Sequence, residues 1–214
     1  MNGSFRKMIK ETIHESQKCQ RNWDLSKHIS EEDKQLILES ATNCPSKQNL
    51  NYYKLHVIED RGTIEKIHEK TKGFGPIYFD YNPEQREENA YDASKSGEMY
   101  TNSQTLAQLL LAFTKNDEGL IERENDDDYD EDRAMAVGIA AGYVNVVATQ
   151  LGYATGCCKC MDGDEIEEIL GESPILLMGV GVPDKTRNRR EHHTEDFVFP
   201  TLKKMKNIET VIHS

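Results

Sequence analysis

A polar segment near residue 45 holds the side chains best suited to ligand chemistry. It runs Asn43-Cys-Pro-Ser-Lys-Gln-Asn-Leu-Asn51, between an apolar-periodic helix and a strand-like run at 53–58. Carboxamides place a donor beside an acceptor, so such a loop can follow the polar edge of a planar heterocycle. Pro, Ser and Asn also favour ordinary turns. Taken alone, the segment is therefore compatible both with a ligand loop and with a plain connector.

Basic side chains gather near both ends of an otherwise acidic chain. Lys18 and Arg21 follow the first predicted helix, while Arg187, Arg189 and Arg190 follow the last predicted strand. Guanidinium groups match the geometry of phosphate oxygens. Each group alone is compatible with a solvated basic face. Together with the polar segment, they form a candidate cradle for a phosphorylated, planar cofactor.

The cysteine pattern favours neither a disulfide framework nor a metal centre. An odd count of five without a secretion signal argues against disulfides. Zinc sites usually place at least two residues between paired ligands, and Cys157, Cys158 and Cys160 lie closer than that. We therefore expect no metal, although a thiol- or metal-based redox centre, completed by His192 and His193, remains the alternative.

Composition limits the partners of the chain. The net charge is −12 and the sequence pI is near 5.1, which disfavours nucleic acid and anionic membranes. No apolar run approaches bilayer length, and the N-terminal residues lack the apolar core of a signal peptide. The sequence thus predicts a cytoplasmic protein. The mean hydropathy of −0.73 predicts exposed insertions.

Hydrophobic periodicity predicts a single domain over 1–214 that alternates helices and strands, typical of an α+β or α/β fold. The helix at 134–151 is almost wholly apolar or small, so it should be buried against a sheet or shared with a second subunit. The other expected elements are helices at 4–20, 30–44 and 63–72 and strands at 53–58, 106–113 and 175–182.

Two stretches have no clear period. Residues 73–100 are rich in Gly, Pro and Tyr and predict a lid or a subunit-contact excursion. Its aromatic residues Phe74, Tyr78 and Tyr81 could stack on substrates or simply pack beneath a loop. Residues 118–132 are strongly acidic and predict a solvated loop.

The order and spacing of these segments resemble the FMN-dependent nitroreductase family over most of the chain. The family's basic-x-Ser-x-basic segment is matched around Lys18, Cys19 and Arg21, which the resemblance places at the FMN phosphate and ribityl chain. Its Pro-Ser-x-x-Asn-x-Gln loop is matched here, with contacts implied to the ribityl chain and the pyrimidine edge. The matching loop residues are Pro45, Ser46, Asn49 and Asn51.

The same resemblance assigns three further segments to the cofactor. Asn102 and Gln104 would lie near the flavin ring. The segment after Leu151-Gly152 would face flavin N5. Its assigned residues are Cys157, Cys158 and Lys159. The C-terminal basic-x-basic grip on the phosphate would be Arg187 and Arg189, with Arg190 as an alternative partner. Two departures stand out, because Cys19 replaces the usual Ser and Asn51 replaces the usual Gln.

What the resemblance implies is an oxidoreductase with an α+β sandwich, a mixed central sheet flanked by helices, and a long helix in a homodimer interface. NADPH or NADH would donate hydride to FMN at N5, and an electron-poor nitroaromatic or quinone would accept it in a ping-pong scheme. No catalytic side chain is required, because the cofactor carries the chemistry. A non-catalytic flavin-binding protein, or flavin-dependent dehalogenation or flavin destruction, uses the same scaffold. No Gly-x-Gly-x-x-Gly opens a helix, which argues against a Rossmann domain.

Overall fold

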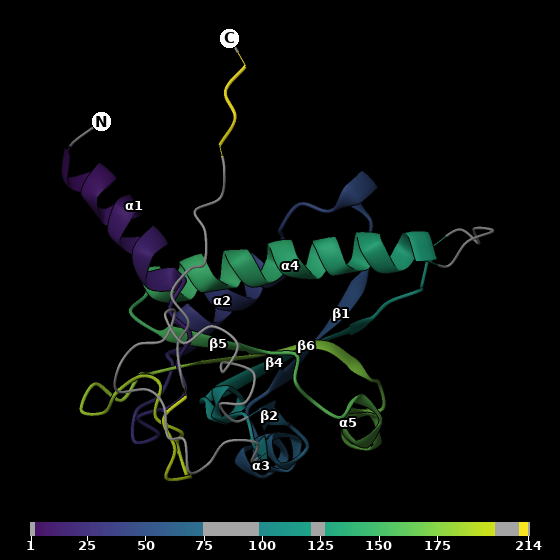
Figure 1. Ribbon diagram of the computed structural model, residues 1–214. Helices are drawn as coiled ribbons and strands as arrows, with labels where there is room; N and C mark the ends of the chain where they lie inside the picture. Colours follow the sequence, from purple (N-terminus) through teal and green to yellow (C-terminus); the bar gives the residue numbers. More distant parts are fainter. Residues whose placement is uncertain (1–2, 75–98, 121–126, 200–209, 214) are drawn as a thin grey trace.

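The computed structural model describes residues 3–74, 99–120, 127–199 and 210–213. These residues form three layers, with a central sheet between two layers of helices (Figure 1). The predicted lid lies almost wholly outside the described residues. Only its ends are seen, where β2 (Gly73–Phe74) pairs antiparallel with β3 (Met99–Tyr100). The predicted α+β sandwich is confirmed.

The central sheet has the strand order β1-β4-β6-β5, and each neighbouring pair is antiparallel. A single parallel bridge, Cys19 with Thr155, adds the segment after the first helix to the outer edge of β5. This bridge brings a predicted cofactor residue onto the sheet edge. The strands are β1 (Tyr53–Ile58), β4 (Leu109–Lys115), β5 (Ala154–Cys158) and β6 (Pro174–Gly181).

The two sheet faces bury different helices. One face packs against α2 (Glu31–Thr42) and α4 (Asp127–Gln150). The other packs against α3 (Arg61–Glu69), α5 (Gly163–Leu170) and the 3-10 helix η5 (Ser103–Leu106). Strand β4 contributes to both cores, because side chains alternate along a strand. Leu109, Leu111 and Phe113 meet the α4 side, while Leu110 and Ala112 meet the α3 side.

Local sequence explains where several helices begin. The Ser30 hydroxyl accepts a hydrogen bond from the Asp33 N–H at 3.1 Å and caps α2, as its acidic first turn suggests. Asp60 caps α3 in the same way, through the Thr63 N–H at 2.8 Å. The first helix, α1, covers Gly3–Ser16, and a 3-10 turn η1 covers Lys47–Asn49.

Three parts of the structure differ from the sequence-based expectation. The residues expected as a loop facing flavin N5 instead include strand β5, and α5 follows it. A signal for α5 was present, since Asp162 caps it and Ile166, Ile169 and Leu170 have helical spacing. The acidic stretch expected as a loop ends in a helix, because α4 begins at Asp127, while residues 121–126 lie outside the described residues. Acidic residues at a helix N-terminus interact favourably with the helix dipole, which explains this start.

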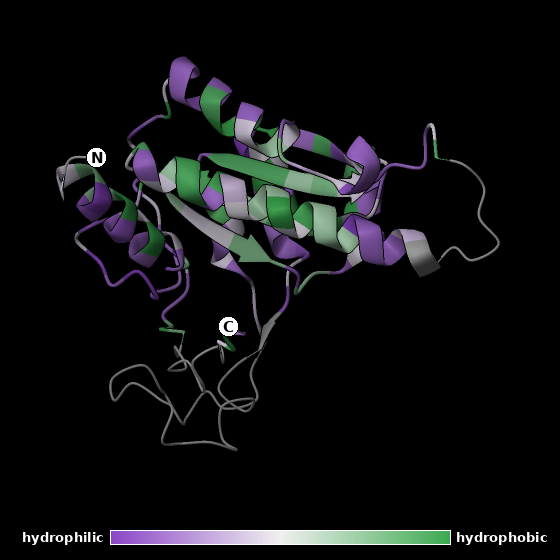
Figure 2. Cartoon of the chain, turned by 90° about the horizontal axis from the view of Figure 1, so that it is seen from above, coloured by the Kyte–Doolittle hydropathy of each residue, from purple (hydrophilic) through white to green (hydrophobic). Residues whose placement is uncertain are grey.

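The outer face of α4 is apolar and exposed. Met135, Tyr143 and Val146 are 59, 46 and 43% exposed. A Cβ added at Gly138 or Gly142 would meet no atom within 4 Å. Figure 2 shows this helix lying across the sheet, with white and green residues along much of its length. Helix α1 adds further exposed apolar side chains: Phe5, Met8, Ile9 and Ile13. In the described part of the chain, no helix is long and apolar enough to span a bilayer.

Candidate functional site

The segment after α1 and the segment after β6 meet at the edge of β5. The Arg21 N–H donates to the Arg189 carbonyl at 3.0 Å, and Arg189 Nη1 donates to the Cys19 carbonyl at 3.1 Å. The Gln20 N–H donates to the Thr155 carbonyl at 2.8 Å, which fixes this segment to the sheet. Two stretches about 170 residues apart in sequence therefore form one unit.

Helix η5 supplies two amides to the same place. Arg21 Nη1 donates to Asn102 Oδ1 at 2.9 Å. Gln104 Nε2 lies at 2.6 Å from Cys19 Sγ and donates to the Cys157 carbonyl at 2.7 Å. We call this set the Arg21–Arg189 cluster. Its members are Cys19, Arg21, Asn102, Gln104 and Arg189.

The two guanidinium groups of the cluster have no carboxylate partner in the described part of the chain. Arg21 donates to Asn102 Oδ1, and Arg189 donates to the Cys19 carbonyl. Burial lowers the pKa of Arg21, and the nearby Arg189 acts in the same direction. The Arg21 guanidinium carbon lies 3.9 Å from the centroid of the Phe199 ring, a cation–π contact. Two guanidinium groups without acids, in a chain of net charge −12, fit an anionic ligand group.

Three other predicted phosphate residues are used differently. Lys18 is half exposed and pairs with Glu15 at 2.6 Å. Arg187 pairs with Glu191 at 3.0 Å and donates to the His192 and His193 carbonyls, so it braces the C-terminal turn. Arg190 is buried and donates through its N–H to Asn188 Oδ1. Arg189 is thus the C-terminal arginine that faces the cluster. A cavity of about 350 Å³ opens beside it, lined also by Lys18, Gln20 and Thr155.

The cysteines of β5 do not converge. Adjacent strand residues point to opposite faces, and accordingly Cys157 packs on the α4 side while Cys158 packs on the α3 side. Burial raises the pKa of each of these thiols to about 12, so both are protonated at neutral pH. Cys160 is exposed. Among the described residues, no group of three His, Cys, Asp or Glu side chains is placed to hold a metal.

The second predicted site segment has an unusual backbone. We call residues 44–51 the Pro-Ser loop. Gln48 and Asn49 have φ values of 54° and 57°, and they are the two non-glycine residues with positive φ in the described regions. The Ser46 hydroxyl donates to the Leu50 carbonyl at 2.8 Å and closes the turn. The carboxamides of Asn49 and Asn51 are exposed. A cavity of about 300 Å³ lies beside the loop, lined by Cys44, Ser46, Asn51, Tyr53 and Asn116 among others.

The structure does not bring the two segments together within one chain. The Pro-Ser loop contacts the first turns of α4 through the ion pair of Lys47 with Asp132. The Arg21–Arg189 cluster lies toward the other end of α4, where Thr155 hydrogen bonds to Asn145. Thirteen residues of helix correspond to about 20 Å along the axis, and Figure 1 shows the two ends well apart. Lys159 is also separate, since it is exposed and lines a cavity with Asp130 and Met161.

Sequence reasoning named His192 and His193 only as possible metal ligands, and it did not place them or their aromatic neighbours beside the cluster. His192 is fully buried, and its Nε2 lies 3.1 Å from the Thr101 carbonyl while its Nδ1 accepts from the Glu195 N–H at 2.9 Å. Burial lowers the pKa of His192 to about 4. The ring of Phe197 stacks on Tyr100 at 4.0 Å. The extended apolar run at 197–199 was the available signal, but its partners are distant in sequence.

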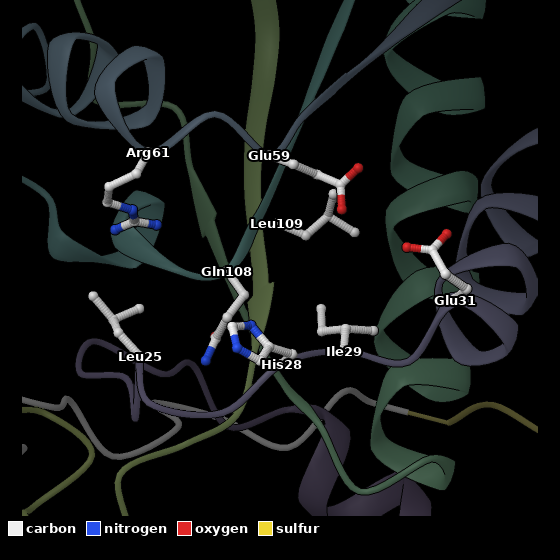
Figure 3. A pocket seen from close by; sticks show the side chains of 8 residues that line it. All are labelled: Leu25, His28, Ile29, Glu31, Glu59, Arg61, Gln108 and Leu109. Atoms are coloured by element: carbon white, nitrogen blue, oxygen red, sulfur yellow. The ribbon is translucent and has the colours of Figure 1, made fainter.

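A third cavity, of about 540 Å³, contains none of the predicted site residues (Figure 3). It lies between the segment before α2 and the junction of β1 with α3. Its polar groups serve the fold. Arg61 Nη1 donates to the Leu106 carbonyl at 3.0 Å, and Gln108 Nε2 donates to the Asp24 carbonyl at 2.7 Å. Glu31 and Glu59 both pair with Lys34. We assign no ligand to this cavity.

Comparisons with known proteins identify the family and agree with the fold. Residues 15–182 match the Nitroreductase family. No curated protein matches the chain. A nitroreductase family protein from Clostridium novyi NT is 17% identical with a TM-score of 0.61, over 88% of this chain and 93% of that one. Nitroreductase A from Vibrio parahaemolyticus is 15% identical with a TM-score of 0.63, over 86% and 70%.

A further similar structure is NfrA2 from B. megaterium. It is 17% identical with a TM-score of 0.64, over 92% of this chain and 76% of that one. At such low identity these structures establish the shared fold, while the family match covers well over half of the chain. The chain therefore belongs to the Nitroreductase family and is an oxidoreductase of that family.

Proposed function

We propose that the protein binds FMN and transfers hydride from NADPH or NADH to an electron-poor acceptor such as a nitroaromatic or a quinone. The observation that carries this proposal is the pair of guanidinium groups of Arg21 and Arg189, which have no carboxylate partner among the described residues. Bound FMN would supply the hydride-accepting and hydride-donating centre. The protein would bind and orient FMN and stabilise its negative charge.

The residues of the Arg21–Arg189 cluster suit different parts of FMN. Arg189 and Arg21 offer charge-assisted donors to the phosphate and to negative charge on the ring system. Asn102 and Gln104 offer carboxamides for the polar edge of the ring system. Their present hydrogen bonds, with Arg21 and with the Cys157 carbonyl, would be replaced by hydrogen bonds to the ligand. Cys157 and Cys158 are protonated thiols, so they are poor nucleophiles and poor metal ligands in this state.

We further propose that the complete site belongs to a homodimer. The Pro-Ser loop and the Arg21–Arg189 cluster lie toward opposite ends of α4. In a two-fold pair with antiparallel α4 helices, the loop of one copy would lie beside the cluster of the other. The exposed apolar face of α4, around Met135, Tyr143 and Val146, supports such a pair, because contiguous apolar surface on this scale marks association sites.

The direct test is the absorption spectrum of the protein as purified, followed by anaerobic addition of each nicotinamide. A yellow protein that bleaches with NADPH or NADH and recovers with a quinone is the expected result. A yellow protein indifferent to both nicotinamides would support a flavin-binding protein or another flavin reaction. A colourless protein that does not take up added FMN would contradict the proposal.

A further inference from the structure

The Pro-Ser loop is strained and yet well defined. Left-handed backbone is unfavourable for a non-glycine residue, and Asn tolerates it better than a long side chain such as Gln. Gln48 and Asn49 adopt it consecutively, with φ values of 54° and 57°. Strain of this kind persists only where surrounding contacts enforce it. Hydrogen bonds within the turn supply part of this enforcement, through the Ser46 hydroxyl and the Asn49 and Leu50 amides, and contacts from outside the turn add to it.

The first turns of α4 provide those contacts. Lys47 Nζ lies 2.8 and 2.9 Å from the two Asp132 carboxylate oxygens. The Asp132 side chain is only 7% exposed, whereas that of Lys47 is 47% exposed. Arg133 Nε donates to the Tyr52 carbonyl at 3.1 Å and fixes the chain just after the loop. The acidic start of α4 thus holds the loop from both sides of Gln48.

The exposed carboxamides of the loop indicate a use for this strained backbone conformation. The side chains of Asn49 and Asn51 are exposed and face no protein partner in the described regions. A loop held in a strained shape, with its amides directed outward, is pre-organised for a ligand. The ion pair restrains the loop without entering the ligand surface that we propose.

We propose that Asp132 is a positioning residue, which acts through Lys47 to keep Gln48 and Asn49 in the left-handed conformation that presents the loop amides to FMN. This inference rests on the proposed function. It also gives a role to one residue of the acidic stretch 118–132, which the sequence alone predicts to be a solvated loop. Asp132 itself is not expected to touch the cofactor.

The test compares Asp132→Asn with Asp130→Asn, a matched control. Asp130 lies in the same helix turn and pairs with Arg133, but not with Lys47, and it is 69% exposed. Hydrogen exchange on the ligand-free protein follows the amides of Asn49 and Leu50, which donate to the Ser46 and Lys47 carbonyls at 3.2 Å. We expect Asp132→Asn to speed their exchange about fivefold or more, and to weaken FMN binding by about three- to tenfold. Asp130→Asn should change both by less than about twofold.

A second substitution separates positioning from general stability. Glycine accepts positive φ without steric cost, so adding Gln48→Gly to Asp132→Asn should restore most of the lost FMN affinity. The inference is overturned if Asp132→Asn exchanges like Asp130→Asn, or if Gln48→Gly restores nothing. If the parent protein binds no FMN, the proposed function fails, yet the exchange comparison still decides whether Asp132 holds the loop.

Discussion

The Arg21–Arg189 cluster and the Pro-Ser loop balance their charges in opposite ways. In the cluster, two guanidinium groups contact an amide, a carbonyl and an aromatic ring, and neither pairs with an acid within the ranges that the structure describes. In the loop, the cation Lys47 is neutralised by Asp132, and the groups left exposed are neutral carboxamides. A phosphate requires unpaired positive charge, whereas a neutral heterocycle edge requires paired donors and acceptors. The difference suggests that each region recognises a different part of one ligand.

The largest effect should come from removing the unpaired charge. We expect Arg189→Ala to weaken FMN binding by more than about tenfold, because a charge-assisted contact is lost. Lys27→Ala is the control, since Lys27 is exposed, is paired with Asp24 and lies outside the cavity beside Arg189, and it should change the dissociation constant by less than about twofold. Fluorescence titration of FMN measures both. Equal losses in the two variants would contradict the assignment of Arg189.

The second effect is a pH response that we expect near the cluster and not in the Pro-Ser loop. His192 is neutral when folded, with a pKa near 4, below the ordinary value of about 6.5. Its stabilising contribution is therefore complete above about pH 6.5 and is lost as the pH falls toward 4. The charged or titratable groups around it are His68 on α3, Arg21 on the segment after α1, and Glu195 on its own segment.

We therefore expect the segment 188–199 to open as the pH falls from 7 to 5, with about tenfold faster amide exchange at Glu195 after correction for intrinsic rates. The Pro-Ser loop should not respond. Trp23, the single tryptophan, reports independently through its fluorescence, because its backbone N–H donates to His193 Nδ1 at 3.2 Å, next to His192 in the chain. His192→Gln should flatten the response, while the exposed control His28→Gln should not. A response unchanged by His192→Gln would disprove the role of His192.

The smallest effect is expected from the clustered cysteines. A chain carrying Cys157→Ala, Cys158→Ala and Cys160→Ser should still bind FMN with a dissociation constant within about threefold. The changes at the part-buried Cys157 and the buried Cys158 should cost about 1–2 kcal/mol of stability. Release of stoichiometric metal from the parent protein, together with loss of fold in the variant, would favour a thiol-based centre instead. Metal analysis and FMN titration on the same preparation decide this.

Local sequence patterns predict much of the fold, but they do not predict that the two site segments lie toward opposite ends of α4. The long apolar stretch at 134–151, the Ser30 cap and the alternating run at 53–58 all correspond to observed elements. Strand β5 is harder to predict, because it has five residues and is stabilised by pairing with β6 rather than by its own pattern. The ion pair of Lys47 with Asp132 joins residues 85 apart, which no local pattern reveals.

The position of the site segments was also beyond local reasoning. Sequence places the Pro-Ser loop and the arginines in one cradle, while the structure separates them along α4 within a single chain. That separation depends on the direction of a 24-residue helix across the sheet, a property of the whole fold. The exposed apolar face of the same helix is the feature that points to a second copy.

The central claim, a site shared between two copies, is tested most directly by complementation. One chain carries Arg21→Ala with Arg189→Ala, and the other carries Ser46→Ala with Asn49→Ala; each alone should fail to retain FMN. Unfolded together in equal amounts and refolded, they should regain about a quarter of the parent's FMN sites, because half of the dimers are mixed and each has one unaltered site. Recovery of no FMN from the mixture, while the parent protein binds it fully, would contradict a site built from two chains.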